Sequence, residues 1–280
     1  MDLTMSWSSL SLLFFISVHI HFLVPASCEF RPFLDYDPFV CGDQQLSYPF
    51  KHVTQPSYYG YPGYELDCDG DNFTLSMESL EYRVIHIDRS AKILKVERSD
   101  LSDDICLPKY VDTALNFSLF DYASQYFNFT LFYGCNSSST PQLYDRFPCP
   151  LSRDGYFAFD PFCETVLHKL CNFIVLVPIS LSEAPGLPTP PPEGGDHGTT
   201  VIGATISELL NKGFEITWIA DTTQCDNCTE SGGICGYNWE RKRFNCFCLN
   251  GAYSPTCNGK RVSGSFPASM YAYSHLLCGF

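Results

Sequence analysis

The chain has 280 residues, with 17 Lys or Arg against 31 Asp or Glu, and its formal net charge is −14. This acidic balance, without a long basic run, argues against a nucleic-acid partner. The length is sufficient for two modest domains. Fifteen cysteines are present, and in an oxidising compartment thiols at this density form disulfides.

Residues 1–26 have the pattern of a signal peptide. The apolar run at residues 10–24 is shorter than the ~20 residues that span a bilayer, and Val24 and Ala26 are spaced as in a signal-peptidase site. A buried helix or an uncleaved anchor is the alternative, because no Lys or Arg precedes the run. We therefore expect a secreted chain. No later segment is apolar enough to predict a transmembrane span.

Five Asn-x-Ser/Thr sequons agree with export and predict glycosylation on exposed positions: Asn72, Asn116, Asn128, Asn136 and Asn227.

The chain is predicted to be mainly β. In the first region, residues 28–106, strand-like runs flank the turn sequence "DRSA" and predict a β-hairpin over residues 83–98. The second region, residues 114–257, continues with alternating stretches such as "YFNFTLFYGC". It is interrupted by a proline-rich loop at residues 183–200, and one short helix is predicted near 205–212, with Gly213 as its left-handed stop. These patterns predict two small β-rich modules stapled by disulfides.

The second module ends in a cluster of six cysteines over residues 225–257: Cys225, Cys228, Cys235, Cys246, Cys248 and Cys257. A zinc site would require paired C-x2-C knuckles, whereas the second pair here is C-x-C. A thioredoxin-like motif would lie between a strand and a helix, whereas "CDNC" leads into a glycine-rich stretch. The spacing favours a disulfide-stapled, EGF-like module over a metal site, and no cofactor is predicted.

Several ordered motifs resemble one family: "FVCGDQQLSYPF", "GYPGYELDC", "LLNKGFEITW" and "CDNCTESGGICGY". They are similar to the ectodomain of plant wall-associated-kinase-like receptors of the leaf-rust-resistance type. The resemblance implies a galacturonan-binding module at residues 28–106 and a cysteine-rich C-terminal module at 114–257. In the family a transmembrane helix and a kinase domain usually follow, so a membrane location is the alternative to secretion.

The resemblance has further implications for the cysteines and for activity. It implies the pairs Cys225–Cys235, Cys228–Cys246 and Cys248–Cys257. Tyr59 replaces a family cysteine, so Cys28 or Cys41 is expected to lack its partner, with Cys278 as a further candidate. Residues 258–280 depart from the family pattern, and the kinase motifs are missing from the sequence. No paired carboxylates, activated nucleophile or clustered histidines are evident, so the chain is not expected to be an enzyme.

If the implied ligand is an acidic cell-wall polysaccharide, cations must meet its carboxylates. The predicted hairpin carries five, opposed by Asp88 and Glu97: Arg83, Arg89, Lys92, Lys95 and Arg98. A solvated strand face with incidental charges is the alternative. The aromatic rings of Tyr58, Tyr59, Tyr61 and Tyr64 could form a platform for sugar rings or could pack the turn around "GYPG".

Two hypotheses of function remain at this stage. The chain is a non-catalytic module that binds pectin, or it is a structural or protein-interaction ectodomain without a carbohydrate ligand. Calcium bridging between uronate and Asp67, Asp69 or Asp71 is a weaker idea, since the sequence lacks the terminal glutamate of an EF-hand loop.

Overall fold

The computed structural model describes residues 29–102, 104–136, 145–147, 149, 154–158, 161–183, 204–262 and 271–272. The chain forms two compact units, Pro38–Asp221 and a second unit of Met1–Asp37 with Thr222–Phe280. The fold is mainly β, as predicted. The predicted signal peptide, Cys28, Cys278 and nearly all of the proline-rich loop lie outside the described residues.

A seven-stranded sheet forms the main part of Pro38–Asp221. Its strands occur in the order β4 (Lys51–His52), β5 (Glu65–Asp69), β6 (Asn72–Met77), β7 (Leu80–Asp88), β8 (Ile93–Arg98), β14 (Phe214–Trp218) and β9 (Phe120–Tyr122). All neighbours are antiparallel except β4 and β5. The predicted hairpin is confirmed as β7–β8, and a register shift between Val84 and His86 marks a bulge.

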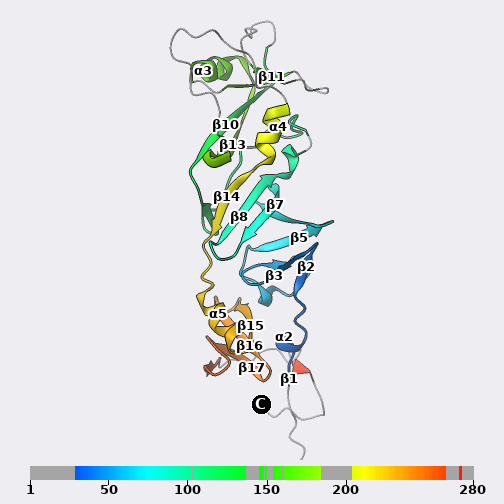
Figure 1. Ribbon diagram of the computed structural model, residues 1–280, viewed down its shortest axis with the longest axis vertical. Helices are drawn as coiled ribbons and strands as arrows, with labels where there is room; N and C mark the ends of the chain where they lie inside the picture. Colours follow the sequence, from blue (N-terminus) through cyan, green and yellow to red (C-terminus); the bar gives the residue numbers. More distant parts are fainter. Residues whose placement is uncertain are drawn as a thin grey trace, which may run out of the picture. The chain divides into compact units, whose positions relative to one another are not determined.

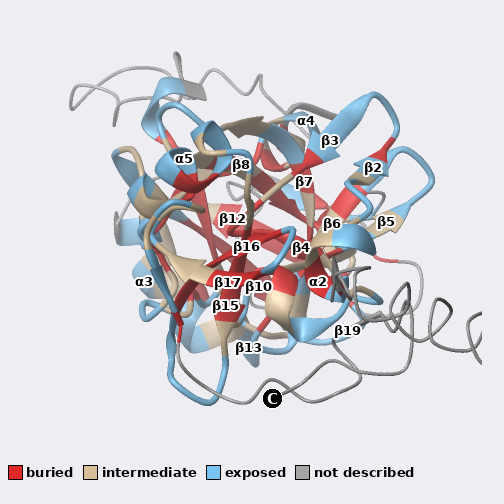
Figure 2. Cartoon of the chain, turned by 90° about the horizontal axis from the view of Figure 1, so that it is seen from below, coloured by how far each residue is buried: buried red, intermediate tan, exposed pale blue. Residues whose placement is uncertain are grey.

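Strand β6 shows why this sequence forms such a sheet. Phe73, Leu75 and Met77 are buried, whereas Asn72 and Ser76 on the opposite face are exposed. Side chains alternate between the two faces of a strand, so this period-two pattern buries one face in a common core. Figure 2 shows the buried residues concentrated on strands and the exposed residues on turns and helix surfaces.

The sheet is completed by strands from much later in the chain. β14 pairs with β8 (Phe214 opposite Val96) and with β9, and Figure 1 shows β14 lying beside β8. Gly213, with φ of +65°, leads into β14, and a Cβ there would lie 2.1 Å from the carbonyl oxygen of Val96. The first sheet therefore combines β8, from the predicted module 28–106, with β14, from the predicted module 114–257.

The two ends of the sheet are joined through the hydroxyl of Tyr64, directly before β5. This hydroxyl donates to the Leu119 carbonyl oxygen at 2.5 Å and accepts from the N–H groups of Ile219 and Ala220 at 3.2 and 3.3 Å. Those partners flank β9 and β14 at the opposite end of the strand order. The sheet is therefore curled, and it encloses a core of side chains from every part of the curve: Leu66, Phe73, Leu75, Tyr82, Val84, Leu94, Val96, Phe120, Phe214, Ile216 and Trp218.

A second sheet has the order β11 (Asp145–Phe147), β12 (Gly155–Ala158), β10 (Tyr126–Tyr133) and β13 (Phe173–Ser180). The predicted helix is confirmed as α4 (Ala204–Asn211), which contacts β8 and β13. Helix α3 (Pro161–Leu170), which sequence analysis did not predict, contacts β10 and β12. Disulfides Cys106–Cys149 and Cys135–Cys171 staple this region.

The first sheet is preceded by a hairpin of β2 (Phe39–Cys41) and β3 (Gln44–Leu46). A disulfide joins Cys41 to Cys68 on β5. Cys41 is therefore not the unpaired cysteine, and the other two candidates, Cys28 and Cys278, lie outside the described residues. The pair depends on β2 and β5 lying close together in the fold, which the sequence pattern does not encode.

The other unit contains a sheet of β15 (Ile234–Asn238), β16 (Arg243–Cys248), β17 (Gly251–Ser254) and β18 (Lys260–Arg261). A short pair, β1 (Glu29–Phe30) with β19 (Tyr271–Ala272), and helix α2 (Arg31–Leu34) also belong to this unit. Helix α5 (Thr223–Glu230) occupies the "CDNC" stretch, where no helix was predicted. Cys225 and Cys228 lie three residues apart on one face of α5 and are both buried, so disulfides hold a helix that its sequence only weakly favours.

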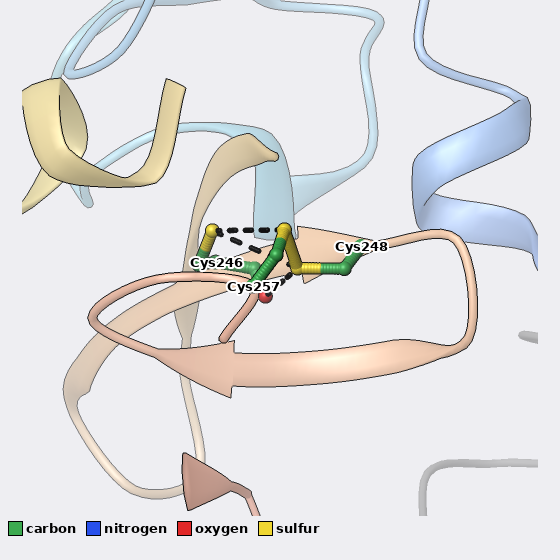
Figure 3. A group of neighbouring side chains, drawn as sticks. All are labelled: Cys246, Cys248 and Cys257. Carbon is green, nitrogen blue, oxygen red and sulfur yellow. Dashed lines mark hydrogen bonds between the residues drawn. A yellow bond between two sulfur atoms is a disulfide. The ribbon is translucent and has the colours of Figure 1, made fainter. Parts of the chain in front are cut away.

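The disulfides of this unit are Cys225–Cys235, Cys228–Cys246 and Cys248–Cys257, the three pairs that the resemblance implies. The Sγ atom of Cys246 lies 3.8 Å from that of Cys248 and 3.9 Å from that of Cys257 (Figure 3). These are packing contacts, because sulfurs joined in disulfides carry no hydrogen to donate and no thiolate for a metal. A Cβ on Gly233 would lie 2.3 Å from the Cys246 sulfur, so only glycine fits there.

Replacing Tyr64 by Phe tests the closure of the curled sheet. The change leaves the buried Ala220 N–H without the Tyr64 hydroxyl, whereas the Ile219 N–H still donates to the Leu119 carbonyl oxygen at 2.9 Å. A buried unsatisfied group costs about 1–3 kcal/mol. Denaturant unfolding of Tyr64→Phe should show a loss of at least this size. The same change at the exposed Tyr126 should be close to neutral, and equal stabilities of the two variants would contradict the role of the Tyr64 hydroxyl.

Alkaline pH should weaken the same closure. Burial raises the pKa of Tyr64 to about 12 from 10.0, and burial likewise raises the pKa of Tyr122 to about 12. The unfolded chain therefore loses these protons near pH 10, before the folded protein does. The stability contribution is complete below pH 10 and is lost as pH rises through about 12. Denaturant midpoints measured from pH 8 to 12 should fall above pH 10, less steeply in Tyr64→Phe; a flat profile would contradict this.

Candidate ligand-binding surface

Two of the five predicted cations form ion pairs with carboxylates of the fold. Arg98 is 2% exposed, and its guanidinium binds Asp100 at 2.8 and 3.0 Å and the Val111 carbonyl oxygen at 2.7 Å. Arg83, half-exposed, forms an ion pair with the buried Glu97, the residue opposite it on β8. Both arginines neutralise carboxylates of the fold, so neither presents an uncommitted charge to a ligand.

The other three cations, Arg89, Lys92 and Lys95, lie at the tip of the β7–β8 hairpin and are here called the hairpin-tip cations. Arg89 is exposed, although it donates to the Gln45 carbonyl oxygen. Lys92 is half-buried in the turn with φ of +58°, and its carbonyl oxygen accepts the Trp218 N–H.

Two carboxylates lie near the hairpin-tip cations. Lys95 lies between His86 on β7 and Glu215 on β14. Asp88 accepts from the Ser90 hydroxyl at 2.6 Å and from the Ala91 N–H at 2.9 Å, and these hydrogen bonds lower its pKa. Asp88 therefore remains charged and organises the turn. The tip keeps a local excess of positive charge, with three cations against these two acids.

The predicted aromatic platform is only partly available. Tyr64 is fully buried and Tyr59 is 4% exposed, so both rings pack the protein interior. Tyr58 and Tyr61 are half-buried; Tyr61 packs edge-on against Tyr64 at 5.5 Å between ring centroids. The "GYPG" segment therefore mainly packs the turn, which was the alternative to a sugar platform.

A separate pocket of about 330 Å³ lies around β5 and β6. Its lining combines four carboxylates with small polar and apolar side chains: Val53, Gly63, Glu65, Asp67, Thr74, Ser76, Met77, Glu78, Glu81, Asn116, Leu119 and Phe120. No Lys or Arg is among these residues. Such a lining accepts hydrogen bonds from hydroxyl or cationic groups and repels a uronate. Sequence analysis missed the pocket because it joins residues from β5, β6, β7 and the loop before β9.

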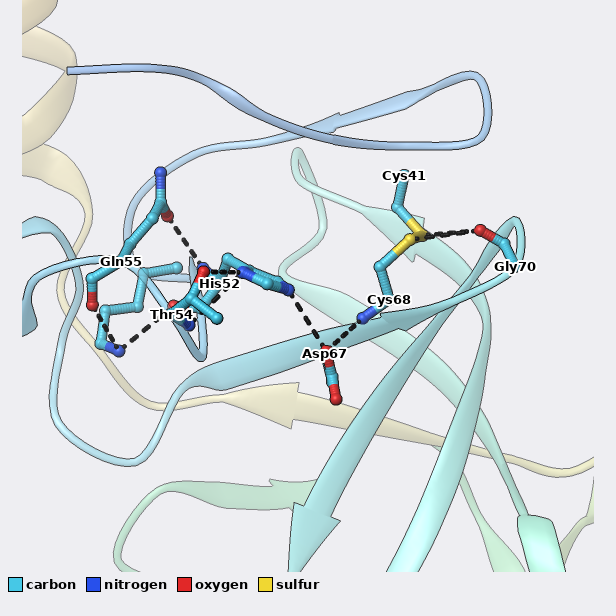
Figure 4. Close-up of polar contacts among 8 residues, drawn as sticks. Cys41, His52, Thr54, Gln55, Asp67, Cys68 and Gly70 are labelled. Atoms are coloured by element: carbon cyan, nitrogen blue, oxygen red, sulfur yellow. Dashed lines mark hydrogen bonds and ion pairs between the residues drawn. A yellow bond between two sulfur atoms is a disulfide. The ribbon is translucent and has the colours of Figure 1, made fainter.

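Two basic side chains of β4 lie beside pocket carboxylates, and Figure 4 shows one of them, His52, against Asp67. Lys51 is 5% exposed, and its ammonium lies 3.7 Å from a Glu65 oxygen. His52 Nε2 lies 3.2 Å from Asp67 Oδ1, and its Nδ1 lies 2.6 Å from the Thr54 hydroxyl. His52 is thus held between two side chains, although no other histidine lies near it in the sequence.

The comparisons with known proteins match two separate parts of the chain. Residues 37–98 match the model of the wall-associated receptor kinase galacturonan-binding family, and residues 162–251 match that of the wall-associated receptor kinase C-terminal family. The chain therefore carries both of these wall-associated receptor kinase domains. The family resemblance inferred from the motifs is confirmed.

Curated relatives extend the similarity over most of the chain. A leaf rust 10 disease-resistance locus receptor-like protein kinase-like 1.3 from Arabidopsis thaliana is 31% identical over 82% of this chain and 31% of its own length. Two others from that plant, numbered 2.8 and 2.5, are 28% identical over 96% and 91% of this chain, covering 27% and 39% of their lengths. The chain thus spans about a third of these relatives. No solved structure matches it.

Two further findings bear on location. The two matched families are those of ectodomains that face the cell wall. None of the helices in the described part of the chain has the length and apolar character needed to cross a membrane.

The difference between the two ion-paired arginines and the hairpin-tip cations can be measured. Arg98→Ala removes the partner of the half-buried Asp100, and breaking such a pair costs about 3 kcal/mol. Lys92→Ala should change the free energy of unfolding by less than about 0.5 kcal/mol, as at other surface positions. Denaturant unfolding of both variants checks this, and equal effects would contradict the distinction.

Proposed function

We propose that the unit Pro38–Asp221 binds de-esterified galacturonan, or a similar acidic cell-wall polysaccharide, through the hairpin-tip cations Arg89, Lys92 and Lys95. The chain acts in this proposal as a non-catalytic extracellular sensor module. The observation that carries the proposal is the position of the hairpin. It lies within residues 37–98, the segment that matches the galacturonan-binding family.

An acidic protein can bind a polyanionic ligand if its carboxylates lie far from the binding site, and the acidic pocket is far from the hairpin tip. The pocket residue Glu81 and the hairpin-tip residue Arg89 lie near opposite ends of β7. At about 3.3 Å per residue they are roughly 25 Å apart along the strand. The Debye length is about 10 Å at 0.1 M salt, so the pocket carboxylates are largely screened from a ligand at the tip.

Charge reversal at the tip tests the proposal. The variant Arg89→Glu, Lys92→Glu, Lys95→Glu should lose de-esterified galacturonan binding, measured with immobilised polysaccharide or by calorimetry. Binding of the native protein should weaken as salt rises from 0.1 M to 1 M, where the Debye length is about 3 Å. Neutral glucan should bind poorly, because it offers no carboxylate to these cations.

The matched control reverses Arg241, Lys242 and Arg243, three exposed cations in the other unit. This triple reversal changes the net charge by the same amount and should leave binding intact. Affinity that survives the tip reversal, or that does not respond to salt, would exclude the hairpin tip as the site. A complete lack of galacturonan binding would favour the alternative of a protein-interaction ectodomain.

A further inference from the structure

Strand β10 carries the sequon Asn128–Phe129–Thr130 beside an exposed aromatic ring. Asn128 is exposed and Tyr126, two residues earlier, is 40% exposed. Residues two apart on a strand point to the same face, and their Cα atoms are separated by about 7 Å. The side chain of Asn128 and the ring of Tyr126 therefore share one surface.

The position of Asn128 differs from those of the other four sequons. The residues two places before Asn72, Asn116, Asn136 and Asn227 are Gly70, Ala114, Gly134 and Cys225. Only Asn128 has an aromatic residue at this offset. A sugar on Asn128 thus has a flat apolar surface on the same face of its strand. Among the other four, only Asn72 lies on a strand, and its residue two places before is Gly70.

The surroundings of Asn128 leave this surface open toward Tyr126. In the other direction along β10, Thr130 is buried and its hydroxyl donates to Glu164 of α3 at 2.9 Å. Tyr122 stacks on Tyr126 with ring centroids 3.8 Å apart. Tyr122 thus covers one face of the Tyr126 ring and fixes its orientation, and helix α3 limits the space on the other side of Asn128.

We propose that Asn128 is N-glycosylated and that the first sugar of its glycan packs on the Tyr126 ring and stabilises the unit Pro38–Asp221. In the transfer, Nδ2 of Asn128 forms a bond to the anomeric carbon of an oligosaccharide carried on a lipid pyrophosphate. The bond from that carbon to the pyrophosphate oxygen breaks, the lipid pyrophosphate leaves with the electron pair, and the amide gives up one proton. The C–H groups of the sugar then gain dispersion contacts with the ring and remove apolar surface from water.

The test uses the full chain expressed through the secretory pathway of a eukaryotic host. Peptide mass mapping should find a glycan on Asn128. Asn128→Gln removes the acceptor and leaves Thr130 bound to Glu164. Its melting temperature should be lower than that of the unchanged protein by about 2–4 °C, the shift that corresponds to about 1 kcal/mol in a unit of this size.

A double-mutant cycle separates the glycan contact from other effects of the change. In the Tyr126→Ala background, Asn128→Gln should leave the melting temperature unchanged, whereas in the Tyr126→Phe background, which keeps the ring, the 2–4 °C loss should persist. Tyr126→Leu replaces the alanine variant should that variant fail to fold. As a control, Asn136→Gln should have the same effect with and without the Tyr126 ring.

Two results would overturn the proposal. One is an unmodified Asn128 in the secreted chain. The other is a loss of thermal stability in Asn128→Gln that is equal in the tyrosine, phenylalanine and alanine backgrounds, because the ring would then make no contribution.

Discussion

The hydroxyl of Tyr64 is the interaction on which the larger unit depends. It joins the segment before β5 to the segments that flank β9 and β14, which are separated from it by 55 and 155–156 residues in the sequence. A curled sheet has to satisfy the backbone groups where its ends approach each other, since unpaired buried N–H and C=O groups are costly. The Tyr64 hydroxyl bonds three of them and adds to the hydrogen bond from the Ile219 N–H to the Leu119 carbonyl oxygen. The core of large aromatic side chains can then pack inside.

The curled sheet also determines which charged side chains are enclosed and which lie at the hairpin tip. β14 pairs with residues 93–96 of β8, and its leading glycine packs on the Val96 carbonyl oxygen, so the hairpin is anchored along its side. Arg83 and Arg98 are then enclosed with Glu97 and Asp100, whereas Arg89, Lys92 and Lys95 remain at the tip. The acidic pocket forms around β5 and β6, near the opposite end of β7. Opposite charges thus separate along one sheet.

The smaller unit reaches stability by another route. Its four-stranded sheet and short helix α5 surround three disulfides whose sulfurs pack against one another and against Gly233 (Figure 3). A unit of this size buries little apolar surface, and closing each loop by a disulfide contributes roughly 2–4 kcal/mol by restricting the unfolded chain. Helix α5 illustrates the effect, because Cys225 and Cys228 are fixed to β15 and β16 and hold a helix with few apolar residues.

The sequence by itself determined the local features: alternation in β6 and β10, the β7–β8 hairpin, helix α4 with its glycine stop, and the two wall-associated receptor kinase families. These follow from periodicity and turn chemistry over a few residues. The tertiary structure alone decided that β14 and β9 complete the first sheet, that Cys41 pairs with Cys68, and that helices form at α3 and α5. It also decided which predicted site residues are exposed. Tyr64 looks like a ligand-binding residue in the sequence, but its hydroxyl binds backbone groups 155 and 156 residues away. Arg98 also looks like one, but it is enclosed by Asp100 and the Val111 carbonyl oxygen. No local pattern encodes these contacts.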